Sequence, residues 1–378
     1  MKKIVNSIYL FIIASIILIP VITINTKENQ ISVVDNAYLP ELPDFTVDRE
    51  EGKSQLENYI NKRIGLREQA IYVYQVIGAK AFHILESPLF MFGEDGHIMG
   101  KQDYYIRDFQ HLNIEENEQL VEAYTNYLSK VNQYLSNEGI EFIYFLVPDK
   151  KIVYPECFPK DIYVYEGKSK TDLILEKLNH KKIPYIYPKE AFLAEKQNTQ
   201  LYNKQYDVYH WNDLGNFYGN CIVDKYISER TNGLTPLRES DYELVYEHRD
   251  TAKETNYPID ENVPVYNLKD KEGIYNVTSE DKFLNEIITS SSKHYENKKL
   301  SNAPTILIFH DSYLGNSDIF YINRYREVIM VHACNYAKMK ELVEEYDPDV
   351  VLFESVERVL RSNSEFWNID SLNEWNAN

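Results

Sequence analysis

Cysteine is scarce in this sequence, with three residues (Cys157, Cys221 and Cys334) in a chain of 378. They are too few and too far apart for a disulfide scaffold or a cysteine-based zinc site, and at most one disulfide could form. Glycine and proline are also sparse, at 13 and 14 residues, while 44% of the residues are hydrophobic. This composition excludes a collagen-like chain and argues against intrinsic disorder, so most of the chain is expected to fold.

Positive charge is in deficit. Lysine and arginine total 40 against 59 aspartate and glutamate residues, which gives a net charge of -19. A duplex-DNA binder needs basic residues that displace counterions from phosphates, so no nucleic-acid partner is expected. The sequence has neither a Walker loop nor a Rossmann glycine-rich turn, and no metal-ligand spacing, so no cofactor and no metal are expected.

Charged residues are absent from residues 4–26, an apolar run that follows Lys2 and Lys3. As a helix at ~1.5 Å per residue this run reaches ~34 Å, enough to cross a hydrocarbon core of ~30 Å. We predict that residues 1–26 are a transmembrane signal anchor, with the rest of the chain on the extracytoplasmic side. The alternative is a cleaved signal peptide and a secreted protein, but the end of the run has no small-x-small cleavage site.

The remaining chain divides by composition and periodicity. Residues 27–47 are polar and proline-spaced, which is typical of a stalk. Residues 48–114 are expected to form a helical N-terminal segment, because apolar residues recur at three- and four-residue steps, followed by a glycine-rich turn at Phe92–His97. Residues 115–378 alternate between strand and helix patterns. Residues 231–300 interrupt that alternation, and we interpret them as an insertion.

The strand–helix alternation predicts a doubly wound, mostly parallel α/β sheet. Strands are predicted at Phe142–Val147, Ile183–Tyr187, Thr305–Phe309, Glu327–Val331 and Asp349–Phe353, mostly continuous apolar runs typical of strands buried on both faces. Helices are predicted at Glu115–Asn137, Ser169–His180, Asn212–Tyr226, about Asn335 to Tyr346, and from Val356 onward.

One polar cluster directly follows the strand predicted at Thr305–Phe309. It reads His310-Asp311-Ser312-Tyr313 and precedes a predicted helix. Ligands of open parallel sheets bind at the carboxyl ends of the strands, and a serine there exposes its hydroxyl at the sheet edge. The backbone N–H groups that follow it can hold an oxyanion. The non-catalytic alternative is an Asp/Ser cap of the helix.

A second polar cluster, Asp207 to Gly215, lies just before the helix predicted at Asn212–Tyr226. His210 is a candidate general base for Ser312, and Asp207 can fix the imidazole tautomer and stabilise its cation. Positions three apart share a side in a turn but not in an extended strand, so residues 207–210 must be turn-like. The alternative is a loop carboxylate beside a surface imidazole. Together the two clusters favour acyl-group chemistry.

The order of these motifs resembles that of the alginate O-acetyltransferase (AlgX/AlgJ-like) family, an SGNH-hydrolase-like group that includes the DHHW proteins. Asp-x-x-His-Trp-Asn at 207–212 is followed, after the insertion, by a strand and Asp311-Ser312. Further similar stretches are Asn58–Arg67, Phe92–Gly96, Val147–Lys150, Tyr154–Glu156 and Pro348–Arg358. The resemblance covers about residues 48–230 and 300–362 and implies an SGNH/flavodoxin-like fold.

The resemblance implies Ser312 as nucleophile, His210 as base and Asp207 as the orienting acid. Two positions depart from the family pattern. The family usually places the acid two residues before the histidine, where this chain has Val208, whereas Asp207 keeps the spacing of the wider SGNH group. That wider group also has glycine where this chain has His310, whose side chain could narrow the site or form a hydrogen bond near Ser312.

Five further residues are candidates for substrate binding or for oxyanion stabilisation: Lys150, Arg358, Asn212, Tyr313 and His310. Surface salt bridges are the alternative role of the lysine and the arginine. The asparagine can instead cap the following helix, and the tyrosine can instead pack against the sheet.

These observations predict an extracytoplasmic O-acetyltransferase that moves acetyl, through Ser312, to a cell-surface or exported polysaccharide. The resemblance implies that a multispanning membrane-bound O-acyltransferase (MBOAT) supplies the acetyl group. The net charge favours a neutral glycan over a strongly anionic one. One alternative is an SGNH-type carbohydrate acetyl esterase, in which water replaces the sugar. Another is a non-catalytic glycan-binding or assembly scaffold.

Overall fold

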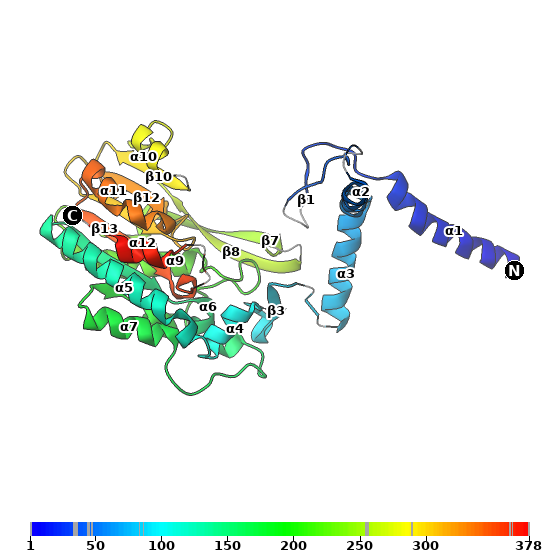
Figure 1. Ribbon diagram of the computed structural model, residues 1–378, viewed down its shortest axis with the longest axis horizontal. Coiled ribbons are helices and arrows are strands. Elements are labelled where there is room, and N and C mark those ends of the chain that lie inside the picture. Colours follow the sequence, from blue (N-terminus) through cyan, green and yellow to red (C-terminus); the bar gives the residue numbers. More distant parts are fainter. Residues whose placement is uncertain are drawn as a thin grey trace. The chain divides into compact units, whose positions relative to one another are not determined.

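Figure 1 shows the computed structural model of the chain, which describes residues 2–32, 37–43, 46, 48–82, 84, 85, 87–253, 257–288, 290–362, 364 and 366–376. The chain divides into two compact units. Met1–Ser87 with Asp250–Asp260 form the first unit, and Pro88–Arg249 with Glu261–Asn378 form the second. Part of the stalk predicted at 27–47 lies outside the described residues.

The first unit is mainly helical. It contains α1 (Lys2–Ile22), β1 (Ile31–Ser32), β2 (Ala37–Tyr38), α2 (Arg49–Arg63) and α3 (Arg67–Phe82). Within α1, the segment Ile4–Ile22 is long and apolar enough to cross a membrane, and none of it is buried in the structure. This helix fits the predicted signal anchor.

Arg63, the last residue of α2, is buried and ties down the segment that precedes this helix. Its guanidinium donates to the backbone carbonyls of Asn25, Lys27 and Pro40 at 2.6–2.9 Å. A guanidinium carries five donors and stays charged, so one side chain can satisfy several carbonyls outside regular secondary structure. The stretch Asn58–Arg67, which contributed to the family resemblance, therefore contains a residue that organises the first unit.

The second unit begins with a β-hairpin. β3 (Phe90–Phe92) pairs antiparallel with β4 (Ile98–Gly100), and the connection between them is the turn predicted from the glycine-rich sequence. Asp95 and Gly96 in this turn have φ values of +53° and +77°, which glycine and aspartate tolerate better than most residues. The hairpin leads into the short helix α4 (Asp103–Phe109).

A seven-stranded sheet forms the core of the second unit, in the order β6-β5-β13-β11-β12-β10-β9. The strands are β5 (Glu141–Val147), β6 (Tyr185–Ile186), β9 (Ile274–Asn276), β10 (Ser292–Asn297), β11 (Thr305–His310), β12 (Glu327–His332) and β13 (Val350–Val356). The five strands from β6 to β12 in this order pair in parallel, and β10 and β9 pair antiparallel. The predicted mostly parallel α/β sheet is confirmed.

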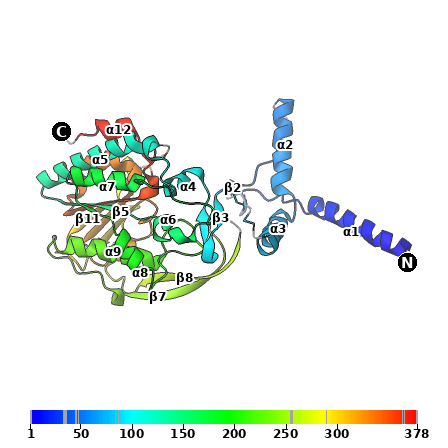
Figure 2. The same cartoon turned by 90° about the horizontal axis from the view of Figure 1, so that it is seen from below.

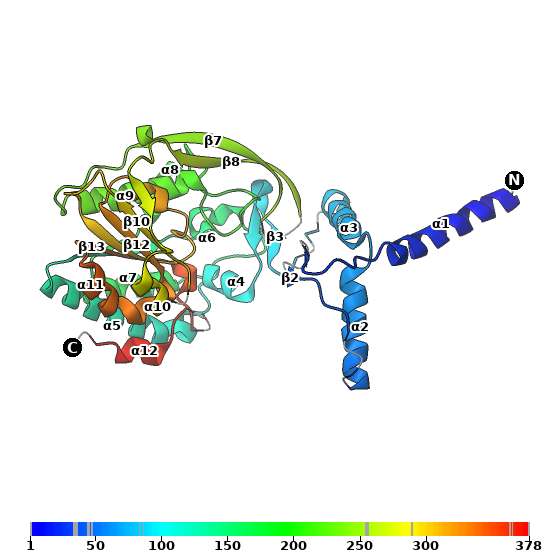
Figure 3. The same ribbon diagram turned by 90° about the horizontal axis from the view of Figure 1, so that it is seen from above.

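Helices cover both faces of this sheet (Figures 2 and 3). α5 (Ile114–Asn137), α7 (Lys170–His180) and α12 (Ile369–Glu374) lie on one face, and α8 (Lys189–Glu195) and α9 (Asp213–Ser228) lie on the other. Every residue of β11 and β13 is buried, which explains why their sequences are largely continuous apolar runs. The short helix α6 (Lys150–Val153) follows β5, and α11 (Met339–Tyr346) follows β12.

The structure corrects two predicted helices. No helix begins at Val356, because β13 continues to that residue and the 3₁₀ turn η6 (Glu357–Val359) follows it. The helix predicted from about Asn335 begins instead as a 3₁₀ turn, η5 (Ala333–Lys338), before α11. At Glu357 and Arg358 the charged side chains are buried beyond the end of β13, and at η5 only Ala333 and Tyr336 are buried, so helical periodicity misplaced both boundaries.

Residues 231–300, interpreted above as an insertion, have two structural parts. β7 (Tyr242–Thr251) and β8 (Pro258–Leu268) pair as a separate two-stranded sheet. β9, α10 (Lys282–Ile287) and β10 follow, and both strands complete the central sheet. β9 is the edge strand and β10 lies next to it, and both are only partly buried, so they lack the apolar signal of the central strands.

The order of the central strands determines where the site forms. β13 is the last strand in the sequence, yet it lies between β5 and β11 and runs parallel to both. The carboxyl ends of these three strands therefore meet at one edge of the sheet. This edge gathers Asp149 after β5, Ser312 after β11 and Arg358 after β13.

Candidate active site

Ser312 lies in a turn just beyond β11, and its side chain is exposed. The helix predicted after it is absent: residues 312–316 form turns, and only the 3₁₀ turn η4 (Asp318–Phe320) follows. The next N–H group, that of Tyr313, is occupied because it donates to Asp311 Oδ1 at 2.8 Å. The N–H group of Ser312 itself has no hydrogen-bond partner within the described residues. It is the amide at this position that could donate to an oxyanion.

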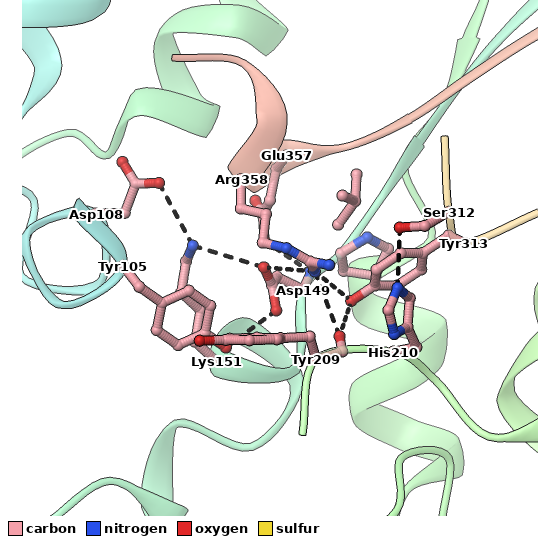
Figure 4. Close-up of polar contacts among 12 residues, drawn as sticks. Tyr105, Asp108, Asp149, Lys151, Tyr209, His210, Ser312, Tyr313, Glu357 and Arg358 are labelled. Carbon is pink, nitrogen blue, oxygen red and sulfur yellow. Dashed lines mark hydrogen bonds and ion pairs between the residues drawn. The ribbon is translucent and has the colours of Figure 1, made fainter. Parts of the chain in front are cut away.

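His210 brings the second polar cluster to Ser312. Its Nε2 atom lies 2.9 Å from Ser312 Oγ, although the two residues are 102 positions apart (Figure 4). Its Nδ1 atom lies 2.9 Å from Asp207 Oδ1. When the Nδ1–H group donates a hydrogen bond to Asp207, the lone pair of Nε2 faces the serine hydroxyl. This is the tautomer that a general base requires.

The loop before His210 is turn-like, as this pairing requires. Residues 204–210 are bends, and Asp207 Oδ1 also accepts the backbone N–H groups of Tyr209 (3.3 Å) and His210 (3.1 Å). One carboxylate oxygen thus shapes the turn and orients the imidazole. The side chains of Asp207 and His210 are 11% and 19% exposed, so both are shielded while the hydroxyl of Ser312 stays accessible.

A second carboxylate fixes the start of this loop. Glu261 in β8 accepts the backbone N–H groups of Lys204, Gln205 and Tyr206 at 2.6–2.9 Å. Three backbone donors on one carboxylate hold a loop that has no regular secondary structure of its own. Sequence reasoning missed this residue, since it belongs to the segment interpreted as an insertion.

Arg358 is buried behind the site and contacts both the segment that contains Ser312 and the loop that contains His210. Its Nη1 atom donates to the Tyr313 hydroxyl (2.8 Å), the Tyr209 carbonyl (3.3 Å) and Asp149 Oδ2 (3.2 Å). The Tyr313 hydroxyl in turn donates to the Tyr209 carbonyl. Figure 4 shows these groups beside the Ser312–His210 pair. Arg358 and Tyr313 therefore support the site from within the protein, and the salt bridge of Arg358 with Asp149 is buried and not at the surface.

Asp149 is the buried counter-ion of this arginine, and sequence reasoning missed it. It is fully buried, and it also accepts a hydrogen bond from the Tyr105 hydroxyl at 3.1 Å. Burial by itself raises the pKa of Asp149, but Arg358 and Lys151 outweigh that effect and hold the pKa below its usual range. Its position directly after the strand predicted at Phe142–Val147 was the signal that could have identified it.

His310 and Glu354 lie beneath Ser312 and are both buried. His310 Nδ1 pairs with the carbonyl of Asp311 at 2.7 Å, and burial lowers the pKa of His310 to about 4, which keeps the imidazole neutral. Glu354 Oε2 accepts the N–H group of Asp311 at 3.0 Å. Burial, followed by the neighbouring Asp311, raises the pKa of Glu354 well above its usual range. His310 thus packs under the turn that contains Ser312, and its side chain does not line the surface around the serine hydroxyl.

Lys150 and Asn212 have structural contacts. The Lys150 ammonium is buried and donates to the carbonyls of Ile98, Asn203 and Lys204 at 2.8–3.2 Å, and burial lowers its pKa to about 8. The Asn212 oxygen accepts the N–H group at the third position of α9, as a helix cap does, and its amide nitrogen donates to the Gln200 carbonyl. The three carbonyls occupy all three donors of the Lys150 ammonium, and the contacts of Asn212 are those of a helix cap.

A metal centre finds no support in the geometry. Among the described residues, no group of three or more His, Cys, Asp or Glu side chains is arranged to hold an ion. The polar groups around Ser312 are instead ordered as a serine, an imidazole and a carboxylate in hydrogen-bond contact. Such an arrangement can move a proton from the hydroxyl to the imidazole as the serine oxygen attacks a carbonyl.

Comparison with known families agrees with the motifs. Residues 98–250 match the family model described as the SGNH hydrolase-like domain of acetyltransferase AlgX. This match confirms, over that part of the chain, the resemblance to the AlgX/AlgJ-like family. The matched stretch is therefore similar to an SGNH-hydrolase-like acetyltransferase domain. No curated protein sequence matches the chain.

Solved structures share the fold. PatB1 from Bacillus cereus has a TM-score of 0.51 at 16% identity, over 73% of this chain and 98% of that chain. PatB1 with a sulfonyl adduct has a TM-score of 0.52 at 15% identity, over 76% of this chain and 97% of that chain. The O-acetyltransferase domain of Pseudomonas putida AlgJ has a TM-score of 0.48 at 14% identity, over 76% of this chain and 99% of that chain. The shared fold rests on the two PatB1 structures, and at their identities the likeness concerns the fold alone.

Proposed function

We propose that this protein is an extracytoplasmic O-acetyltransferase that moves an acetyl group to a hydroxyl of a polysaccharide through an acyl-enzyme at Ser312. The observation that carries the proposal is the contact of Ser312 Oγ with His210 Nε2 at 2.9 Å, backed by Asp207 on Nδ1. The family match to an acetyltransferase domain supports acetyl as the transferred group.

In the first half of the reaction the enzyme is acetylated. His210 Nε2 takes the hydroxyl proton while Ser312 Oγ forms a bond to the acetyl carbonyl carbon of a donor ester. The carbonyl oxygen becomes negative in the tetrahedral intermediate, where the Ser312 N–H group can donate to it. The bond between the carbonyl carbon and the donor's leaving group then breaks, and the leaving group takes the proton from His210. Asp207 stabilises the imidazolium between these two steps.

In the second half a sugar hydroxyl replaces the donor. Its proton passes to His210 Nε2 as its oxygen attacks the carbonyl carbon of acetyl-Ser312. The bond from that carbon to Ser312 Oγ breaks, and Oγ recovers the proton from His210. The products are an O-acetylated sugar and the free serine. Water in place of the sugar would give acetate, so transfer requires that the sugar outcompete water at the acyl-enzyme.

The proposed extracytoplasmic location of the enzyme determines how the acetyl group must reach it. The segment Ile4–Ile22 suits a membrane anchor, and the two lysines before it favour an N-terminus on the cytoplasmic side. Activated acetyl groups are made in the cytoplasm, so a partner must carry acetyl across the membrane to Ser312. A multispanning membrane-bound O-acyltransferase is the partner that we propose.

Labelling and transfer assays on the purified full-length protein test this function. A sulfonyl fluoride should modify Ser312 in the wild type and nothing in Ser312→Ala, and 4-nitrophenyl acetate should acetylate the same serine. The acetyl group should then pass to an oligosaccharide faster than to water. Hydrolysis that added sugar does not change would identify an esterase instead. An unlabelled Ser312 in folded protein would leave the scaffold as the better description.

A further inference from the structure

A polar cavity of about 340 Å³ lies on the β8 side of the loop that carries Asp207 and His210. It is lined by residues 198–200 and Asn203, by Asn212 and Leu214 at the start of α9, and by residues of β7 and β8. Its volume falls within the range of small-molecule sites. None of these residues takes part in the reaction described above.

The chemistry of the lining points to an uncharged polyhydroxylated ligand. Asn198, Asn203 and Asn262 line the cavity, and their side chains make no hydrogen bond within the described residues. Asn203 is 5% exposed and lines the cavity, so the cavity is where its amide can meet a ligand. An amide both donates and accepts hydrogen bonds, which matches a ligand that does both. Sugar hydroxyls do both.

An aromatic ring completes the cavity. Tyr246 on β7 lines it and is 60% exposed. An exposed ring can pack against the C–H face of a sugar while its hydroxyl remains free to form hydrogen bonds. A phosphorylated or polyanionic ligand does not fit, because no lysine or arginine is among the described residues that line the cavity. The one charged side chain there, Glu261, already accepts three backbone N–H groups.

The cavity is close to the catalytic loop. Tyr202 and Trp211 form an antiparallel bridge, and the Asn212 N–H donates to the Leu201 carbonyl at 3.0 Å, so the two ends of the loop lie side by side. Asn212, at the cavity, is two residues from His210, a separation of at most ~7 Å along the chain. A chain of sugars with one unit in the cavity can therefore extend toward Ser312.

We propose that this cavity is an acceptor subsite for a neutral oligosaccharide, in which Tyr246 packs against a sugar ring and Asn203 and Asn262 bind its hydroxyls. The proposal rests on the transferase function above and specifies the class of its acceptor. Glu261 links the two sites, because the same side chain lines the cavity and fixes the loop that carries Asp207.

Direct binding tests the subsite separately from catalysis. The full-length protein in a detergent without a sugar headgroup is titrated with pentamers of glucose, N-acetylglucosamine and mannuronate, in the Ser312→Ala variant. We expect at least one neutral pentamer to bind and the anionic mannuronate pentamer not to bind. Tyr246→Ala and Asn262→Ala, each added to Ser312→Ala, should weaken binding about tenfold or more.

A matched control is available. Tyr163 is also 60% exposed and lies outside the cavity, so Tyr163→Ala should retain the affinity of the parent. Thermal unfolding of the Tyr246 variant verifies that lost binding is not lost folding. Binding unaffected by Tyr246→Ala and Asn262→Ala, preference for mannuronate, or no binding of any neutral pentamer would overturn the subsite. Failure of the proposed reaction shows separately, as absent labelling of Ser312 in the wild type.

Discussion

The Tyr313 hydroxyl donates a hydrogen bond to the backbone carbonyl of Tyr209. Tyr313 directly follows Ser312 and Tyr209 directly precedes His210, so this bond joins the two segments that must meet for catalysis. Arg358 donates to both partners of the bond from the carboxyl end of β13. The buried contact between Tyr313 and Tyr209 therefore lies one residue away from both Ser312 and His210, and it helps to set the distance between the serine hydroxyl and the imidazole.

Removing this hydroxyl should disturb the site more than the fold. Tyr313→Phe loses the link to the Tyr209 carbonyl, which keeps Arg358 as a donor at 3.3 Å. We expect a loss of about 1 kcal/mol in the free energy of unfolding, measured with urea, and a lower kcat with little change in KM. Tyr325→Phe is the control, because the buried Tyr325 hydroxyl makes no hydrogen bond within the described residues. An equal loss of stability in both variants would contradict this role.

The carboxylate of Asp207 should be needed for its charge as well as its shape. Asp207→Asn can still accept the N–H groups of Tyr209 and His210, so the turn should survive. The amide no longer stabilises the imidazolium or fixes the tautomer. We expect kcat for acetyl transfer to fall about 1,000- to 10,000-fold with the circular dichroism spectrum unchanged. The exposed Asp161→Asn should behave as the wild type. A loss under tenfold for Asp207→Asn would show that another group orients His210.

Arg358 and Asp149 should act as a coupled buried pair. Arg358→Gln leaves Asp149 charged and buried without its main partner, which should cost about 3–5 kcal/mol in the free energy of unfolding. Asp149→Asn in that background removes the uncompensated charge, so the double variant should be more stable than the sum of the single losses predicts. Urea unfolding of the four proteins measures the coupling. Strictly additive losses would rule out direct dependence of one charge on the other.

His294 should make stability depend on pH at the far edge of the sheet. Its Nδ1 and Nε2 atoms contact Asp281 and Glu327 at 2.6 and 2.9 Å, and the Tyr346 hydroxyl also donates to Asp281. Burial lowers the pKa of His294, but the two carboxylates outweigh it and raise the pKa above its ordinary 6.5. A raised folded-state pKa stabilises the fold fully below pH 6.5, and this contribution disappears as pH rises through the raised value.

Unfolding measured from pH 5 to pH 9 should therefore show a loss of stability above about pH 6.5 that His294→Gln abolishes. His180→Gln, at an exposed histidine, serves as the control and should retain the wild-type profile. Identical profiles for the wild type and His294→Gln would mean that the imidazole is not charged in the folded protein.

Much of the fold could be predicted from the sequence, because local patterns of apolar residues indicate where strands and helices form. A strand buried on both faces is largely a continuous apolar run, which identified the segments of β5, β11, β12 and β13. The edge strand β9 and its neighbour β10 lack that signal, since both are only partly buried. The segments after Ser312 and after Val356 form turns that are held by buried contacts. Such contacts leave no periodic pattern in the sequence, so helices were predicted at both places in error.

The sequence by itself determined the residue types of the site. Ser312 follows a buried strand and Asp207 precedes His210 by three positions, and both facts are local. Only the tertiary structure decided that β13 would lie between β5 and β11 in the sheet. This order brings Arg358, which follows β13, into contact with Asp149, which follows β5, behind Ser312 and His210. The tertiary structure also decided that Lys150 would be buried and that Glu261 would hold the catalytic loop. Such contacts join residues separated by tens to hundreds of positions, and their stability comes from packing and burial that no local pattern encodes.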